Sequence, residues 1–222
     1  MLTSNKKLGN GVVSFSIPAI DTCPGSSKLC ERVCYASRGG YAYPSVKNHL
    51  ERMRKLARSP EFVDAMVLHI RNTNSSVIRI HSSGDFDTVE YIRRWTKIVR
   101  RVPNVTFYAY TRSWRIKRLR KDLYTLSKQP NMLLWFSTDK ELHQRFGRPP
   151  RWKTTRVAYM QCDYDEVIPG YADLVFRIKR KTAVKYVQGK LVCPAENGIH
   201  GKVKQQCTNC RLCFTDRPIP TK

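Results

Sequence analysis

Acidic residues are scarce in this chain: 17 Asp and Glu stand against 41 Lys and Arg, which gives a formal charge of +24. A charge excess of this size repels itself, and it favours a polyanionic partner over a neutral or basic one. Long apolar runs are also missing, since no stretch of about eighteen apolar residues occurs, and we therefore expect no membrane-spanning helix. No apolar segment follows Lys6 and Lys7, so we expect no secretory signal and a cytoplasmic protein.

The positive charge is concentrated in the middle of the chain. Eleven basic residues and no acidic one occur between Arg93 and Lys121. Tryptophans are interspersed among them, and aromatic rings beside cations can stack on nucleic-acid bases. The sequence therefore predicts DNA or RNA as the partner, with a solvated surface of no particular role as the alternative. The cations expected to contact phosphates, on the helix after the third strand, are Arg115, Lys117, Arg118, Arg120 and Lys121.

Cysteine, in contrast, is grouped at the two ends of the chain. The first group is Cys23, Cys30 and Cys34. The second group is Cys193, Cys207, Cys210 and Cys213. Disulfides are the alternative use of cysteine, but the thiols of a cytoplasmic protein stay reduced, so clustered cysteines favour metal binding. Cys162 stands apart and is expected to be a small buried residue.

The spacing favours an iron–sulfur cluster over zinc. The last three cysteines of the second group follow one another as C-x2-C-x2-C, a spacing found in bacterial ferredoxins, and no histidine has zinc-finger spacing. Four thiolates can close a metal site, whereas the three of the first group leave one position open. A further alternative is a single cluster that takes cysteines from both ends of the chain.

Short β-rich runs alternate with amphipathic helical stretches. The predicted strands are residues 11–17, 76–81, 104–110, 132–137, 155–160 and 172–178. The predicted helices are residues 44–58, 60–71, 88–102, 116–127 and 140–146. Such alternation predicts an α/β fold with a largely parallel sheet. We expect residues 1–190 to form this unit and residues 191–222 to form a cysteine-rich segment packed on it.

Polar residues follow several of these strands, at the edge of the sheet where sites usually form. Ser83, Gly84 and Asp85 follow the second strand, and Arg112 follows the third. We expect Asp85 and Arg112 to be site residues. Asp87 and Asp139 are instead expected to cap the helices that follow them.

These motifs resemble two known families. A cysteine triad after the first strand, together with a Gly-acidic turn after strand two, resembles the layout of radical S-adenosylmethionine enzymes. That resemblance implies a partial, about six-stranded TIM-like barrel with helices outside and a [4Fe–4S] cluster on the triad. It also implies that Ser83, Gly84 and Asp85 bind S-adenosylmethionine, and that the second group holds a further cluster.

Over most of the chain, the pattern CPG…C…CYA at the start and CPA…C-x2-C-x2-C at the end is similar to a phage gene-product-88-like iron–sulfur domain family. These observations lead to two functional hypotheses, one for an enzyme and one for a non-catalytic binding protein. One is a radical-type iron–sulfur enzyme that acts on nucleic acid, with Asp85 and Arg112 in its site. The other is a non-catalytic iron–sulfur protein that binds nucleic acid or senses redox state.

Overall fold

The fold is built on one open sheet of eight strands, in the order β1-β2-β3-β4-β5-β6-β8-β7. The computed structural model describes residues 1–179, 182–196 and 205–221. The strands are β1 (Val12–Phe15), β2 (Val77–Ile80), β3 (Thr106–Thr111), β4 (Met132–Asp139), β5 (Thr155–Gln161), β6 (Leu174–Arg177), β7 (Tyr186–Val187) and β8 (Lys190–Val192).

Six of these strands, β1 to β6, correspond to the six predicted from the sequence, and they pair in parallel in chain order. The short strands β7 and β8 were not predicted; β8 extends the parallel sheet beside β6, and β7 pairs with it in antiparallel fashion. The sheet does not close, because β1 and β7 remain its two edges. The α/β class and the largely parallel sheet are thus confirmed, and the expected partial TIM-like barrel is not.

Helices connect the strands. The α-helices are α1 (Lys28–Arg32), α2 (Pro44–Arg58), α3 (Phe62–Arg71), α4 (Val89–Arg101), α5 (Arg120–Ser127), α6 (Lys140–Phe146) and α7 (Cys207–Cys210). The 3-10 helices are η1 (Tyr35–Ser37), η2 (Gly39–Ala42), η3 (Ser113–Arg115), η4 (Lys117–Leu119) and η5 (Pro194–Glu196). Within the described ranges, no helix combines the length and apolar character needed to cross a bilayer.

Two of the predicted helix starts need correction. The helix predicted from residue 116 begins at Arg120, because the segment before it is the separate turn η4. The N-cap of α4 is Thr88, whose hydroxyl accepts a hydrogen bond from the Tyr91 amide, and the predicted cap Asp87 instead pairs with Arg58 at 2.9 Å. The prediction for Asp139 is confirmed, since its carboxylate accepts from the Leu142 amide at 2.9 Å and caps α6.

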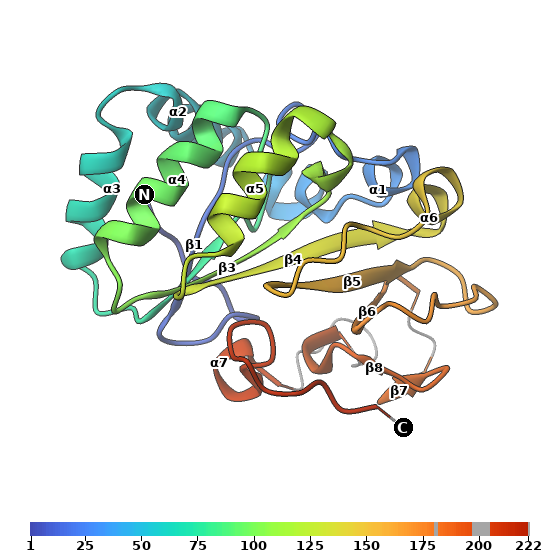
Figure 1. Cartoon of the computed structure of the whole chain (residues 1–222). Helices are drawn as coiled ribbons and strands as arrows, with labels where there is room; N and C mark the ends of the chain where they lie inside the picture. The colour runs from blue at the N-terminus through green and yellow to red at the C-terminus, as the bar shows by residue number, and fades with distance from the viewer. Residues whose placement is uncertain (180–181, 197–204, 222) are drawn as a thin grey trace.

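The sheet separates two layers with different contents. Figure 1 shows α3, α4 and α5 on one face of the sheet and the C-terminal segment with α7 on the other. Alternate residues of each strand point to opposite faces, so β3 presents Phe107 to the helical layer and Tyr108 to the C-terminal segment. The helical layer contains the larger apolar core, which includes Trp95 and Phe62 at zero exposure.

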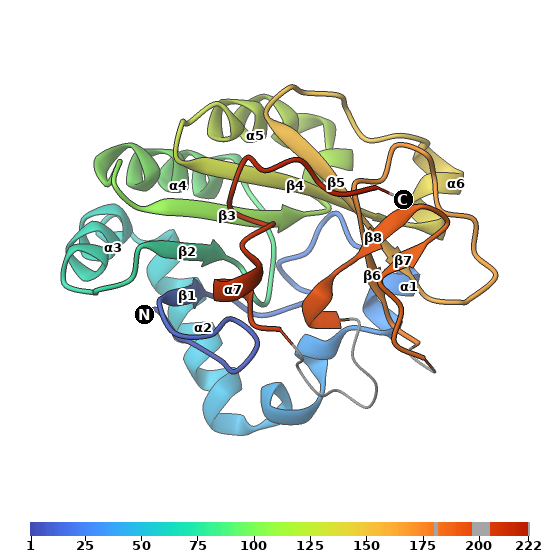
Figure 2. The same ribbon diagram turned by 90° about the horizontal axis from the view of Figure 1, so that it is seen from below.

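The C-terminal segment is attached to the start of the chain as well as to the sheet. The amides of Cys207 and Thr208 donate to the carbonyls of Lys7 and Leu8, at 2.9 and 3.1 Å. The view from below in Figure 2 shows α7 beside the N-terminal turn and across the sheet from the helices. The expected boundary between residues 190 and 191 falls inside β8, so the sheet and the cysteine-rich segment share a strand.

Candidate functional site

The two cysteine groups lie in different layers of the structure. The first group follows β1, at the carboxyl end of the parallel strands, where its thiols interact electrostatically with one another and with Asp85. The second group packs against the opposite face of the sheet from the helices, beside Tyr108 and Tyr110 of β3. The two groups therefore form two separate candidate sites.

The backbone of the turn after β3 holds the loop of the first group closely. A Cβ on Gly25 would lie under 3.0 Å from the Arg112 carbonyl and from the Ser113 amide, so only glycine fits there. The guanidinium of Arg115 donates to the carbonyls of Pro24 and Ser26, both at 3.0 Å. The loop that carries Cys23 is thus pressed onto the end of β3.

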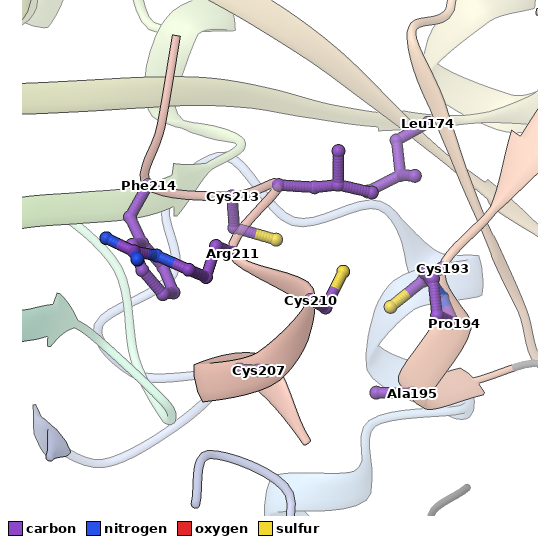
Figure 3. Close-up of a pocket in the computed structure, with 10 residues that line it drawn as sticks. Leu174, Cys193, Pro194, Ala195, Cys207, Cys210, Arg211, Cys213 and Phe214 are labelled. Atoms are coloured by element: carbon purple, nitrogen blue, oxygen red, sulfur yellow. The ribbon is translucent and has the colours of Figure 1, made fainter. Parts of the chain in front are cut away.

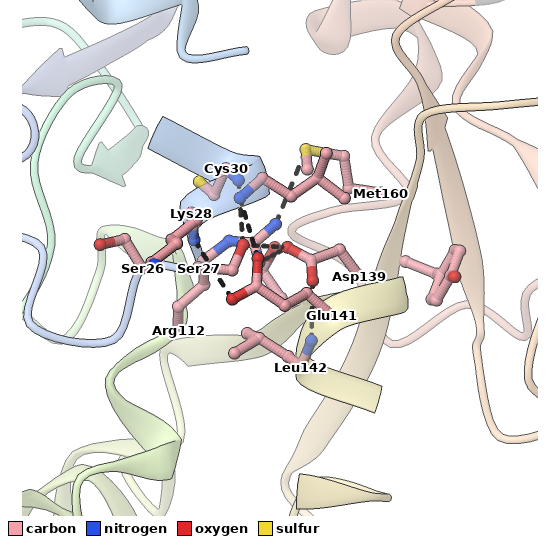
Figure 4. Close-up of polar contacts among 12 residues, drawn as sticks. Ser26, Ser27, Lys28, Cys30, Arg112, Asp139, Glu141, Leu142 and Met160 are labelled. Atoms are coloured by element: carbon pink, nitrogen blue, oxygen red, sulfur yellow. Dashed lines mark hydrogen bonds and ion pairs between the residues drawn. The ribbon is translucent and has the colours of Figure 1, made fainter. Parts of the chain in front are cut away.

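The N-terminus of α1, which carries Cys30, is held by acidic residues from the end of β4 and the start of α6. Ser27 caps α1 by accepting from the Cys30 amide at 2.9 Å, and its hydroxyl donates to Asp139 at 2.6 Å. The carboxylate of Glu141 accepts from the Leu29 amide at 3.0 Å. Figure 4 shows these contacts converging from residues more than one hundred positions apart. Carboxylates near a helix N-terminus also stabilise the helix dipole.

Arg112 completes this network. It forms an ion pair with Asp139, in which the arginine side chain is 9% exposed and the aspartate 0%. A second nitrogen of the guanidinium lies 3.7 Å from the Met160 sulfur. Buried ion pairs of this kind are costly to break, because either partner alone becomes an uncompensated charge. Arg112 therefore has a clear positioning role, and its predicted role in catalysis stays a prediction.

The predicted turn after β2 is also engaged in backbone contacts. The carboxylate of Asp85 accepts from the amides of Phe86 and Arg112, at 2.7 and 2.8 Å. Burial raises the pKa of Asp85 to about 6, although these hydrogen bonds oppose the shift. Ser83 donates to the Ile17 carbonyl at 2.9 Å, and Gly84 has a φ of 83° in a position where a Cβ would strike Ile17. The turn thus joins β1, β2 and β3, and its binding of S-adenosylmethionine stays a prediction.

The second group lines a single pocket together with apolar side chains. The pocket residues are Leu174, Cys193, Pro194, Ala195, Cys207, Cys210, Arg211, Leu212, Cys213 and Phe214. In Figure 3 the sulfur atoms of Cys193, Cys210 and Cys213 point into the same space. The hydroxyl of Tyr110 donates to the Cys213 sulfur at 2.8 Å, and the Trp135 indole donates to the Cys213 carbonyl at 2.9 Å. The four cysteines of this part of the chain thus lie around one pocket.

Burial raises the pKa of thiols in both cysteine groups. It raises the pKa of Cys23 and Cys30, with the charge of Arg112 opposing the shift for Cys30. It also raises the pKa of Cys213 to about 11. A bound cation would stabilise the thiolates and displace the thiol protons, because thiolates are the form that ligates metal.

The donor chemistry of both groups fits a soft metal or an iron–sulfur cluster, because thiolates select such centres over hard cations. The geometry is less convergent: among the described residues, no three Cys, His, Asp or Glu side chains are arranged as a group that could hold a metal ion. The ligand sets therefore agree with the predicted chemistry by residue type and by shared location, while cluster binding stays a prediction.

The five cations predicted to contact nucleic acid do not share one helical face. Arg115 is half-buried and bonded to the cysteine loop, and the Arg120 guanidinium donates to the Trp114 carbonyl at 2.8 Å. Lys117 and Arg118 lie in η4, and Lys121 lies in the first turn of α5. The prediction of a single helix bearing all five is wrong, because the chain turns twice before α5 begins.

Sequence reasoning missed several residues around the two groups. Ser27 and Glu141 hold α1, and their only sequence signal is the serine three positions before Cys30, a helix-capping pattern. Tyr110 bonds to Cys213, and Arg79 lies on the same face with its guanidinium 5.7 Å from the Tyr110 ring. An arginine inside an otherwise apolar strand was the signal for Arg79. Cys162, as expected, is buried.

Comparison with known proteins identifies the family. Residues 1–216 match the family described as Gene product 88. The Gene 88 protein of Mycobacterium phage L5 is 25% identical over 210 residues, which cover 88% of this chain and 79% of the relative. The Gene 88 protein of Mycobacterium phage D29 is 26% identical over 212 residues, with the same shares. No solved structure matches the chain. The expected resemblance to phage gene product 88 is thus confirmed, and the chain belongs to the Gene product 88 family.

Proposed function

We propose that this protein is an iron–sulfur protein with a [4Fe–4S] cluster in each of its two cysteine groups, and that it acts on or with nucleic acid. One observation carries the proposal: the four cysteines of the second group line one apolar pocket although they come from two separate stretches of chain. Buried thiols without a metal gain nothing from such grouping, whereas cluster ligands require it.

Three features of the second group favour a cluster over zinc. Its pocket is lined by Leu174, Leu212 and Phe214, and an apolar surround suits an iron–sulfur cluster that must be shielded from water. The hydrogen bond from Tyr110 to the Cys213 sulfur is of the kind that tunes cluster potentials. Histidine, the usual companion of cysteine in finger-type zinc sites, does not line this pocket as far as the structure describes it.

The first group supports a more reactive role. Its three cysteines would leave one iron without a protein ligand, at the carboxyl end of the strands where parallel α/β sheets bind ligands. The sequential strand order, with α3, α4 and α5 on one face of the sheet, agrees with a partial barrel of the radical-enzyme type. S-adenosylmethionine is the ligand proposed for the open position, and Asp85 and Arg112, which interact electrostatically with Cys23 and Cys30, would be the residues that orient it. The cluster, when bound, would supply electrons for reductive cleavage, while the protein would hold and orient the ligand.

The decisive experiment is metal and sulfide analysis of protein purified without oxygen. We expect brown protein that contains iron and inorganic sulfide. Cys210→Ala should lose part of both and should also lower stability sharply, because ligands from distant segments couple metal binding to folding. The matched control is Cys162→Ala, which removes a buried thiol outside both groups and should keep the full iron content. Colourless protein with stoichiometric zinc would contradict the proposal.

The enzymatic part has its own test. Adding S-adenosylmethionine to the reduced protein should change the electron paramagnetic resonance spectrum of the first cluster. Cys30→Ala should abolish that change and leave the signal of the second cluster.

A second candidate is a non-catalytic iron–sulfur protein that binds nucleic acid. The observation that favours it is the engagement of Asp85 and Arg112, the two predicted site residues, in internal contacts. An unchanged spectrum with S-adenosylmethionine, in protein that still holds iron and binds nucleic acid, would support this candidate over the enzyme.

A further inference from the structure

An aromatic and basic surface follows the first cysteine group directly. We propose that residues 35–43, the stretch of η1 and η2, bind single-stranded nucleic acid by stacking its bases on Tyr35 and Tyr43. This inference deepens the proposed function, on which it rests, by naming the class of substrate and where it docks. It also moves the docking site away from the α5 region predicted from the sequence.

The exposure of the two tyrosines is the first observation. Tyr35 is 59% exposed and Tyr43 is 63% exposed, more than any other aromatic side chain in the described ranges. Folded proteins usually bury such rings, and exposed aromatic clusters mark interaction sites. Tyr41 packs against Tyr35 with ring centroids 6.0 Å apart and an interplanar angle of 67°, so these two rings form an aromatic pair.

The charge around the rings selects the partner. Lys28, Arg32, Arg38 and Lys47 are all exposed, and the carboxylate in this stretch, Glu31, is bonded to the Ser26 hydroxyl. A surface that combines exposed cations with open aromatic faces is the recognition pattern for single strands, in which phosphates pair with the cations and bases stack on the rings.

The surface is fixed in place rather than loose. The Tyr35 hydroxyl donates to the Ser82 carbonyl at the end of β2, and the Arg38 guanidinium donates to the Arg32 carbonyl. The side chain of Tyr43 makes no capping bond at the start of α2. Tyr43 is therefore exposed on a rigid frame, and preorganisation of this kind lowers the entropic cost of binding.

The backbone between the rings leaves room for a ligand. Gly39 and Gly40 have no heavy atom within 4 Å of a built Cβ, so the space beside them is open. The bases of a duplex are already stacked on one another, and only a single strand or a splayed loop can offer them to tyrosine rings. Because Tyr35 directly follows Cys34, a base stacked there would lie next to the first cysteine group.

The test is fluorescence anisotropy with a labelled twelve-nucleotide single strand, using the full-length protein at low salt. We expect Tyr43→Ala to weaken binding about 5- to 150-fold, the usual effect of removing one stacking partner. Tyr43→Phe should bind like the wild type, because it keeps the ring. An abasic strand of equal charge has no bases to stack, so the alanine variant and the wild type should bind it equally. If Tyr43→Ala instead disturbed the fold, it would weaken binding to this strand as well.

Control variants test the other candidate docking site, the basic surface at η4 and α5 that the sequence predicted. Tyr124→Ala removes an exposed tyrosine of α5, and Arg118→Ala with Lys121→Ala removes two exposed cations nearby. We expect each to change single-strand affinity by less than Tyr43→Ala does. Equal binding by Tyr43→Ala and the wild type, or a loss confined to the α5 variants, would overturn the inference. Iron and sulfide are measured on the same samples, so retained clusters with unchanged binding would reject this surface and leave the proposed function standing.

Discussion

The two cysteine groups are held by different kinds of interaction. Charged and polar side chains position the first group: Asp139 and Glu141 hold α1, and Arg115 holds the loop before it. Apolar side chains and backbone hydrogen bonds surround the second group, in a pocket against β3, β4 and β6, and side-chain donors of Tyr110, Trp135 and Arg156 bond to it there. A polar frame suits a site that exchanges ligands, whereas an apolar frame suits a closed centre that is structural or transfers electrons.

The largest expected effect comes from breaking the frame of the first group. Asp139→Ala leaves Arg112 as a buried unpaired charge, removes the cap of α6 and leaves the Ser27 hydroxyl without its acceptor, so we expect a loss of about 3–5 kcal/mol in the free energy of unfolding. Urea unfolding measures it. Alkylation followed by mass spectrometry should show faster labelling of Cys30 in reduced, metal-free protein, with Cys213 unchanged.

Asp87→Ala is the matched control. It also breaks an aspartate–arginine pair, but its partner Arg58 is 52% exposed. Surface pairs contribute about 0–1 kcal/mol, so this variant should unfold almost like the wild type. Similar losses for the two variants, or equal acceleration of labelling at Cys30 and Cys213, would mean that the two groups do not differ as the structure indicates.

A second prediction concerns pH and the buried end of β2 near the first group. Burial lowers the pKa of His81 to about 3, with the charge of Arg79 adding to the shift. Below about pH 6.5 the unfolded chain takes up a proton that the folded protein does not, so stability should fall by about 1.4 kcal/mol per pH unit as the pH drops from about 6 to about 4.

His81→Asn should remove that contribution. Asparagine tolerates the left-handed backbone of this position, where φ is 70°. The measured quantity is the difference in free energy of unfolding between the two proteins, followed from neutral pH down to about pH 4. The raised pKa of Asp85 acts in the opposite direction, but it is common to both proteins and cancels in the difference. Parallel pH curves for the variant and the wild type would contradict the prediction.

The smallest expected effect concerns the second cysteine group and the hydrogen bond that Tyr110 makes to it. Tyr110→Phe removes the hydroxyl that donates to the Cys213 sulfur, and we expect a loss of about 1 kcal/mol in unfolding free energy. In cluster-bearing protein the same change should make the reduction potential of one cluster more negative, because a hydrogen bond to sulfur favours the reduced state. Protein-film voltammetry would resolve the shift.

Tyr108→Phe serves as its control. This neighbouring tyrosine faces the same side of β3, and its buried hydroxyl has no hydrogen-bond partner within the described part of the chain. Removing a hydroxyl that makes no bond should leave stability unchanged or raise it slightly. A larger loss for Tyr108→Phe than for Tyr110→Phe would show that the bond to Cys213 is not what stabilises this region.

The sequence predicted the main architecture because hydrophobic periodicity is a local property. Six strands, four of the five helices nearly to their ends, and the grouping of the second set of cysteines followed from spacing alone. The contact between Ser27 and Asp139 could not be predicted, because it joins residues 112 positions apart through the fold. The contact of Arg115 with the loop of the first cysteine group could not be predicted either. Nothing in a run of cations distinguishes a guanidinium that packs inside the protein from one that faces solvent.

The hydrogen bonds between the segment of α7 and the N-terminal turn affect the order in which the chain folds. The Gln206 side-chain amide donates to the Lys6 carbonyl across 200 positions of sequence. Closing a loop of that length costs about 5 kcal/mol of chain entropy, and contacts of such high contact order form late. The second cysteine group can therefore dock against the N-terminal turn only after the sheet has brought the two ends of the chain together. That docking would mark a late step of folding.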